Sequence, residues 1–337
     1  MWALRNRTGF AAERNWTRDR DGIHWWVVAV RATFDLVAGG RLALADQQLP
    51  PTLAPVYFGE PGASSLRYDS ELLSAKPGTD VVVHAQAHAP GGRAASTVPV
   101  AVRVGALEKR LIVHGDRVYY RGPAGGLTTT APRPFMARAI RYELAYGGRD
   151  LTDPDPRQHR IDQRNPVGRG FAVRVATLIN QPAHVIEYPG GDPAQRGPAG
   201  FGPIDTSWLP RRALAGTYDQ RWSDSKKPLL PDDYDPRHAL CAPADQQTAQ
   251  PLIGGERVAL TNLTAEGSMV FDLPRVALAF CSRFGRRREQ HGPRLTTVLI
   301  ETEVRRVSLV WQSVLRVSAD QADYLDETEI VEGRGAA

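Results

Sequence analysis

The sequence has few cysteines, few lysines and no long apolar run. Cys241 and Cys281 are its only cysteines, and they are too far apart for a disulfide framework or a zinc site. We expect them to be small buried residues. No stretch approaches the roughly 18 apolar residues of a membrane-spanning helix. The first residues also lack the apolar core of a signal peptide. These absences predict a soluble protein of the cytoplasm.

Arginine supplies most of the positive charge. Lysine occurs only at positions 76, 109, 226 and 227, although basic residues number 42 and the formal net charge is +5. The arginines are scattered among acidic residues, and only the stretch from Arg283 to Arg288 is densely basic. No aromatic RNA-binding motif accompanies it. We therefore expect neither nucleic acid nor a membrane as a partner.

Apolar residues with a period of two dominate the first and last thirds of the chain. The stretch from Trp25 to Phe34 is almost continuously apolar, which is typical of a strand covered on both faces. Alternating patterns predict further strands over 42–44, 81–89, 98–104, 107–113, 118–120, 256–263, 268–273, 276–282, 294–303 and 305–317. Short turns join many of them, which favours sheets without crossover helices. The predicted fold is all-β, with mainly antiparallel sandwich- or barrel-like sheets and few short helices.

The middle of the chain has a different composition. Residues 147–255 are rich in Gly, Pro, Asp and Arg, yet they contain seven aromatic residues between Phe171 and Tyr234. So many aromatic side chains are unusual for a disordered linker. We predict a β-sheet region over 1–146, an ordered irregular segment over 147–255 packed on the β core, strands over 256–317 that complete the fold, and a short helix or tail over 318–337.

The sequence holds no recognisable catalytic or cofactor motif. His84 and His88 have a spacing that suits one metal ion on a helix, but on a strand they are about 13 Å apart. The glycine-rich stretch 197–202 lacks the flanking strand, helix and spacing of a phosphate loop. Sugar hydrolysis needs a pair of carboxylates, and these can lie far apart in the sequence, so the absence of a local motif does not exclude it. We nevertheless predict a protein that is not an enzyme, with no cofactor and no metal site.

Turn-like strings carry polar residues instead. They are 65–69, 76–80, 115–117, 164–171 and 216–219. Arg and Asp side chains in such strings can pair with each other and bond loop carbonyls, which would fasten long irregular loops. A groove for a ligand or peptide is the other interpretation of the same residues.

Some of these strings, together with further short strings, follow one another in a fixed order between residues 5 and 312. They are 26–34, 76–81, 142–148, 165–171, 201–204, 208–211, 215–219 with Trp222, 231–235, 242–247, 254–256 and 260–263. In this order they resemble a bacterial domain-of-unknown-function family, number 2169, of type VI secretion effector adaptors. The chain departs from the family at Tyr119, where members tend to carry Trp, and at Thr296, where they tend to carry Asp.

The resemblance implies an accessory protein that binds a toxic effector, through the effector's N-terminal region, and helps load it onto the VgrG spike. Aromatic and arginine side chains most often anchor interfaces. We therefore predict partner contacts by Trp208, Arg211, Arg212, Tyr218 and Trp222. The other interpretation of Trp208 and Trp222 is that both are core residues. A carbohydrate-binding or carbohydrate-processing β protein is the alternative, because loop aromatics and carboxylates would serve it too. A structural component of the secretion apparatus is a third possibility.

Overall fold

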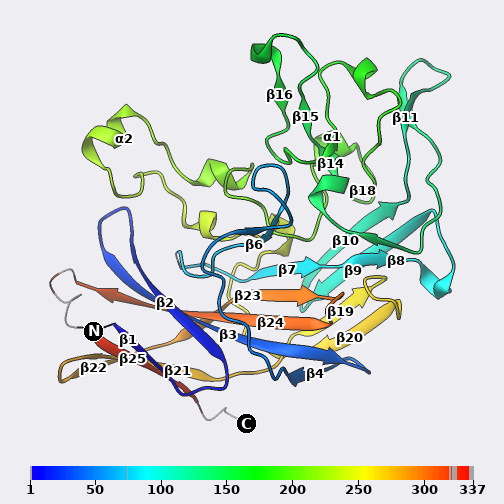
Figure 1. Ribbon diagram of the computed structural model, residues 1–337. Coiled ribbons are helices and arrows are strands. Elements are labelled where there is room, and N and C mark those ends of the chain that lie inside the picture. Colours follow the sequence, from blue (N-terminus) through cyan, green and yellow to red (C-terminus); the bar gives the residue numbers. More distant parts are fainter. Residues whose placement is uncertain (1, 74, 319, 321–324, 334–337) are drawn as a thin grey trace.

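A six-stranded sheet forms the centre of the fold. The computed structural model describes residues 2–73, 75–318, 320 and 325–333 (Figure 1). The central sheet has the order β2-β3-β24-β23-β7, with β4 beside β3. Its strands are β2 (Ala11–Arg18), β3 (His24–Val37), β4 (Arg41–Leu44), β7 (Asp80–His84), β23 (Pro293–Glu301) and β24 (Arg306–Val317). All pairs are antiparallel except β7 with β23.

Two further sheets complete the apolar core. The first has the order β18-β10-β9-β19-β20 and consists of β18 (Ile186–Glu187), β10 (Leu107–His114), β9 (Thr97–Val104), β19 (Arg257–Thr261) and β20 (Ser268–Asp272). The second has the order β1-β25-β21-β22 and consists of β1 (Ala3–Asn6), β25 (Leu325–Glu332), β21 (Leu278–Phe284) and β22 (Arg287–His291). In Figure 1 this second sheet lies below the central one.

The inner face of the central sheet packs on both of these sheets. One continuous cluster joins Trp26 and Val30 of β3 to Val100 of β9 and Phe280 of β21, and all four are at most 2% exposed. The Trp26 indole Nε1 also donates a 2.8 Å hydrogen bond to Thr328 in β25. Burying a side chain of this size contributes roughly 1.5–3 kcal/mol. The alternating sequence pattern is therefore the direct source of this sandwich, and the predicted all-β class is confirmed.

The remaining elements are short. Five two-stranded ladders pair β5 (Val56–Tyr57) with β6 (Leu66–Tyr68), β8 (Gln86–His88) with β13 (Ala137–Ala139), β11 (Tyr119–Arg121) with β12 (Leu127–Thr129), β14 (Tyr146–Gly147) with β17 (Arg169–Gly170), and β15 (Arg149–Asp150) with β16 (Arg160–Ile161). The α-helices are α1 (Pro193–Arg196) and α2 (Gln220–Ser225). Single 3₁₀ turns cover Pro90–Gly92, Tyr142–Leu144, Pro156–Gln158, Val175–Leu178, Arg211–Leu214, Pro236–Ala239 and Ala244–Gln246. Within the described residues, no helix is long and apolar enough to cross a membrane.

The middle segment lies above the central sheet in Figure 1, on the side away from β1 and β25. Specific polar contacts hold it there. Gln246 Nε2 donates to the carbonyls of Val81 and Phe201 at 2.6 and 2.9 Å. The Lys109 ammonium on β10 donates to Asp245 at 2.8 Å, and burial lowers the pKa of this lysine to about 8 against the opposing effect of Asp245. These bonds explain how so much irregular backbone stays ordered.

Two local predictions need correction. The end of the chain, predicted as a short helix or tail, instead contains the strand β25, because it pairs in parallel with β1 and antiparallel with β21. The helix expected to open at Ser318 lies mostly outside the described residues. The strand predicted over 81–89 is divided at Ala85, because β7 pairs with β23 whereas β8 pairs with β13.

Candidate functional site

A cleft of about 630 Å³ lies between two segments that are distant in the sequence. One wall is the turn between β2 and β3, and the other is the segment 206–239, which carries α2. Its lining residues are Thr17, Arg18, Asp19, Arg20, Asp21, Trp25, Asp69, Ser70, Leu73, Ala75, Lys76, Thr206, Arg211, Tyr218, Leu230, Tyr234, Pro236, His238, Ala239 and Val314. The volume lies in the roughly 300–1,000 Å³ range of ligand pockets.

Two of the predicted partner residues are buried beneath this segment. Trp208 is 4% exposed and meets the Tyr142 ring edge-on at 5.8 Å. Arg211 is 6% exposed and pairs with Asp69 at 2.6 Å. Its guanidinium also donates to the carbonyls of His238 and Ile204 at 2.9 and 2.8 Å. Both side chains therefore fix the segment to neighbouring loops, and Arg211 reaches the cleft only as part of its floor.

The other three predicted residues are more accessible. Tyr218 is 53% exposed and lines the cleft, and its ring lies edge-on to that of half-buried Trp222 at 4.7 Å. Asp219 between them caps α2 by accepting a 2.8 Å bond from the Trp222 amide. Arg212 points elsewhere and bonds Gln163. The structure therefore brings Arg211 and Tyr218 to one cleft, whereas Trp208, Arg212 and Trp222 do not line it. The contact of all five residues with a partner stays a prediction.

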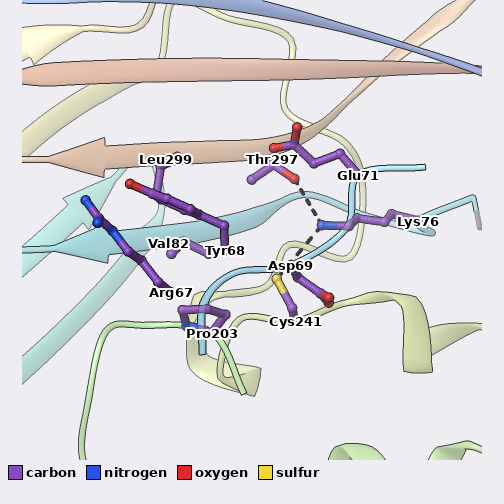
Figure 2. Close-up of a pocket in the computed structure, with 10 residues that line it drawn as sticks. All are labelled: Arg67, Tyr68, Asp69, Glu71, Lys76, Val82, Pro203, Cys241, Thr297 and Leu299. Carbon is purple, nitrogen blue, oxygen red and sulfur yellow. Dashed lines mark hydrogen bonds between the residues drawn. The ribbon is translucent and has the colours of Figure 1, made fainter. Parts of the chain in front are cut away.

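Beneath the cleft, the outer face of the central sheet carries a buried ion pair. The Lys76 ammonium lies 2.7 Å from Asp80 and 3.0 Å from the Thr297 hydroxyl. Figure 2 shows this ammonium pointing toward Thr297 and Cys241. Asp80 also accepts bonds from the backbone amides of Cys241 and Ala242, each at 3.0 Å. The polar groups of this floor thus have partners within the chain.

The electrostatics agree with a structural role for this pair. Burial alone would lower the pKa of Lys76, but the charge and hydrogen bond of Asp80, together with Cys241 and Asp69, outweigh it, so the pKa of the lysine is raised. Burial raises the pKa of neighbouring Glu71 above its ordinary value. The small cavity among these groups holds about 20 Å³, which is room for one water molecule and no larger ligand.

The two histidines of the strand region, His84 and His88, have separate partners. The His84 Nε2 donates to the Arg67 carbonyl at 2.7 Å, whereas His88 lies 3.5 Å from Glu303. Burial lowers the pKa of His84 to about 4. Among the described residues, no group of three His, Cys, Asp or Glu side chains is placed to hold a metal ion.

Sequence reasoning found some of the cleft and missed the rest. The strings 65–69 and 76–80 were predicted to fasten loops, and the Asp69 and Lys76 pairs do so. Trp25, Leu73 and the turn Asp19–Gly22 were not singled out. The Asp21-Gly22 turn was visible in the sequence, but nothing there indicates that it faces a segment two hundred residues away.

A sequence model of one protein family matches residues 21–312, which is most of the chain. That family is described as uncharacterized proteins conserved in bacteria, DUF2169. No curated protein and no solved structure matches. The match spans the strands from β3 to β23 and the fastened middle segment, but it leaves out β2, the end of β24 and the cleft residues 17–20 and Val314. The chain therefore belongs to the DUF2169 family of bacterial proteins.

Proposed function

We propose that this protein is a non-enzymatic adaptor that binds a toxic effector and helps load it onto the VgrG spike of a type VI secretion system. The observation that carries the proposal is an open cleft with aromatic and aliphatic walls on a framework whose buried charges are already paired. Such a cleft suits recognition by shape and apolar contact. The resemblance of the sequence to type VI secretion effector adaptors indicates that the partner is an effector protein.

The lining residues support protein binding. Trp, Tyr and Arg are the residues enriched at interface hot spots, and the cleft offers Trp25, Tyr218 and Arg18. The fastened middle segment supports it as well, because a wall that is ordered before binding loses less conformational entropy when a partner docks.

Co-purification of the full chain with the effector encoded beside it tests the proposal. We expect the two to associate, and the VgrG protein to join them. Association would be measured by affinity capture followed by size-exclusion chromatography of the complex. If the effector never associates, with or without VgrG, the adaptor proposal is wrong.

A carbohydrate-binding role is the second candidate. The rings of Trp25, Tyr218 and Tyr234 and the carboxylate of Asp19 line the same cleft, and aromatic rings beside carboxylates are common in sugar sites. A glycan-binding and hydrolysis screen separates the two functions. An adaptor is inert in that screen, whereas a carbohydrate-binding protein retains specific glycans without the effector.

A further inference from the structure

The two walls of the cleft meet at one end through exposed polar contacts. Lys226 pairs with Asp232 at 2.7 Å and donates to the Arg20 carbonyl at 3.1 Å. The Arg20 guanidinium in turn donates to the Asp232 carbonyl at 2.9 Å. These bonds join the β2–β3 turn to the segment after α2. The cleft is therefore a defined concave site.

The walls expose apolar side chains that the fold itself does not bury. Leu73 is 56% exposed and Tyr218 is 53% exposed, although both line a concavity. Trp25, Leu230 and Val314 are only half-buried there. Apolar surface that is gathered in a concave site commonly marks a binding site. A bulky apolar side chain from a partner would remove this surface from water.

The rim of the cleft offers hydrogen-bond donors. Arg18 lines the cleft, and Arg316 lies near Asp19. Burial alone would raise the pKa of Asp19, but the bond from Trp25, the backbone bonds and the charge of Arg316 together lower it. Within the described ranges, neither arginine forms an ion pair. The Asp19 carboxylate already accepts bonds from the Ile23 amide and the Trp25 indole, each at 2.9 Å. The Asp21 carboxylate at the same rim lies 4.0 Å from the Arg20 guanidinium. The Arg18 guanidinium has no acidic partner among the described residues, and its N–H donors pair best with carboxylates.

The floor adds no charge of its own. Arg211 is neutralised by Asp69 at 2.6 Å, and Lys76 by Asp80 at 2.7 Å. A ligand therefore meets an apolar interior with a donor-rich rim. That combination distinguishes an acidic, apolar peptide segment from a basic one.

We infer that this cleft is the effector-binding site, and that it takes an extended effector segment carrying a bulky apolar side chain with an Asp or Glu beside it. The apolar side chain lies between Leu73, Trp25 and Tyr218, and the carboxylate reaches Arg18. This inference rests on the proposed function, since it names the part of the effector that the adaptor holds.

Charge placed in the cleft tests the apolar contact. Leu73→Asp and Tyr218→Asp alter exposed side chains, so folding should be retained. Val173→Asp is the matched control, because Val173 is 61% exposed and does not line the cleft. We expect each cleft variant to weaken binding of the full-length effector at least tenfold by isothermal titration calorimetry. The control should bind like the unmodified protein.

Charge reversal at the rim tests the carboxylate contact. Arg18→Glu should weaken effector binding about threefold to tenfold, and the loss should shrink as salt is raised, because rim charges act largely on the association rate. Arg93→Glu makes the same charge change at another exposed arginine. It should leave the affinity unchanged.

The outcomes separate the two claims. Weaker binding by the cleft and rim variants, with both controls unchanged, supports the inference. Unchanged binding by Arg18→Glu overturns the carboxylate contact. Equal binding by all variants overturns it while leaving the adaptor function intact. No binding by the unmodified chain overturns the adaptor function, and the inference with it. Stronger binding by Arg18→Glu overturns the acidic character of the segment.

Discussion

The two faces of the central sheet are built on different principles. The inner face places Val30, Leu309 and Ile300 against neighbouring sheets, and all three are fully buried and apolar. The outer face also buries its side chains, but these include Arg31 and Asp80, at 4% and 0% exposed. The first face is covered by regular strands, whereas the second is covered by irregular backbone.

This difference follows from what each face has to hold. Apolar contact is non-directional, so strands of the right alternation suffice to cover the inner face. Irregular loops have unpaired backbone groups that need partners of fixed position. From the strand, the Asp80 carboxylate accepts bonds from the amides of Cys241 and Ala242. From the loop side, Gln246 donates to the carbonyls of Val81 in β7 and of Phe201. Polar residues on a buried strand face are therefore fasteners of the loops above it.

Removing the Asp80 carboxylate should lower the free energy of unfolding more than any other change considered. In Asp80→Ala, Lys76 keeps a buried charge with no counter-ion and two amides lose their acceptor, so we expect a loss of about 3–5 kcal/mol in the free energy of unfolding. Urea denaturation measures it, with exposed Asp46→Ala as control. Hydrogen exchange should rise first over 238–248 and only later in β9 and β10. Uniform loss of protection would contradict the separation of the two faces.

A cavity on the inner face should lower the free energy of unfolding slightly less, and its effect on hydrogen exchange should spread further. Leu309→Ala removes a fully buried side chain from the main cluster, and comparable substitutions cost about 3 kcal/mol. We expect protection to fall throughout all three large sheets, because they share this core. Leu44→Ala, at a 52% exposed position, is the control. A purely local effect at Leu309 would show that the core is not continuous.

Acid should weaken both faces through buried histidines. Burial lowers the pKa of His84, on the outer face, and of His291, which contacts β24 from β22, to about 4 from 6.5. Below pH 6.5 the unfolded chain therefore binds more protons than the folded one, so stability falls as the pH drops from 6.5 to 4. Each shift corresponds to roughly 3 kcal/mol at most.

Thermal denaturation across that pH range measures this effect. His84→Gln and His291→Gln should each flatten part of the dependence between pH 6.5 and 5. A profile in either variant as steep as that of the unmodified protein would show that the histidine concerned is not held neutral by its burial.

The exposed contact at the end of the cleft should matter least. Lys226→Ala removes the ion pair with Asp232, whose side chain is 77% exposed. Such surface pairs contribute less than about 1 kcal/mol. We expect a shift in melting temperature of no more than a few degrees, with Lys227→Ala as the matched control. A large loss of stability would mean that the folding of the cleft wall depends on this contact, which would then do more than join the two walls.

Much of the fold was predictable because strand patterns are local. The apolar stretch from Trp25 to Phe34 indicated a strand covered on both faces, and residues 26–34 are indeed buried on both. The strand β25 was not predicted, since its alternating charged residues gain stability only from their partners β1 and β21. Propensity is overridden there by tertiary pairing.

The candidate cleft was predictable only in its parts. Tyr218 and Arg211 could be selected because Tyr and Arg are common at interfaces. Asp69 and Lys76 could be selected as residues that fasten loops. The pairing of Arg211 with Asp69 joins positions 142 residues apart, and the sequence contains no signal for that partner choice. The sequence left Trp208 as either a core residue or a contact residue, and it could not indicate which, because its neighbour Tyr142 comes from another loop.

The amino-acid sequence alone specifies that this chain forms sheets with an apolar interior, because a period of two places alternate side chains on one face wherever the strand lies. It also determined that the middle segment carries groups able to fasten it. Only the tertiary structure decided which groups pair, and which aromatic residues stay exposed in the cleft. Those choices depend on distances between remote segments, which are set when the loops close over the outer face of the central sheet.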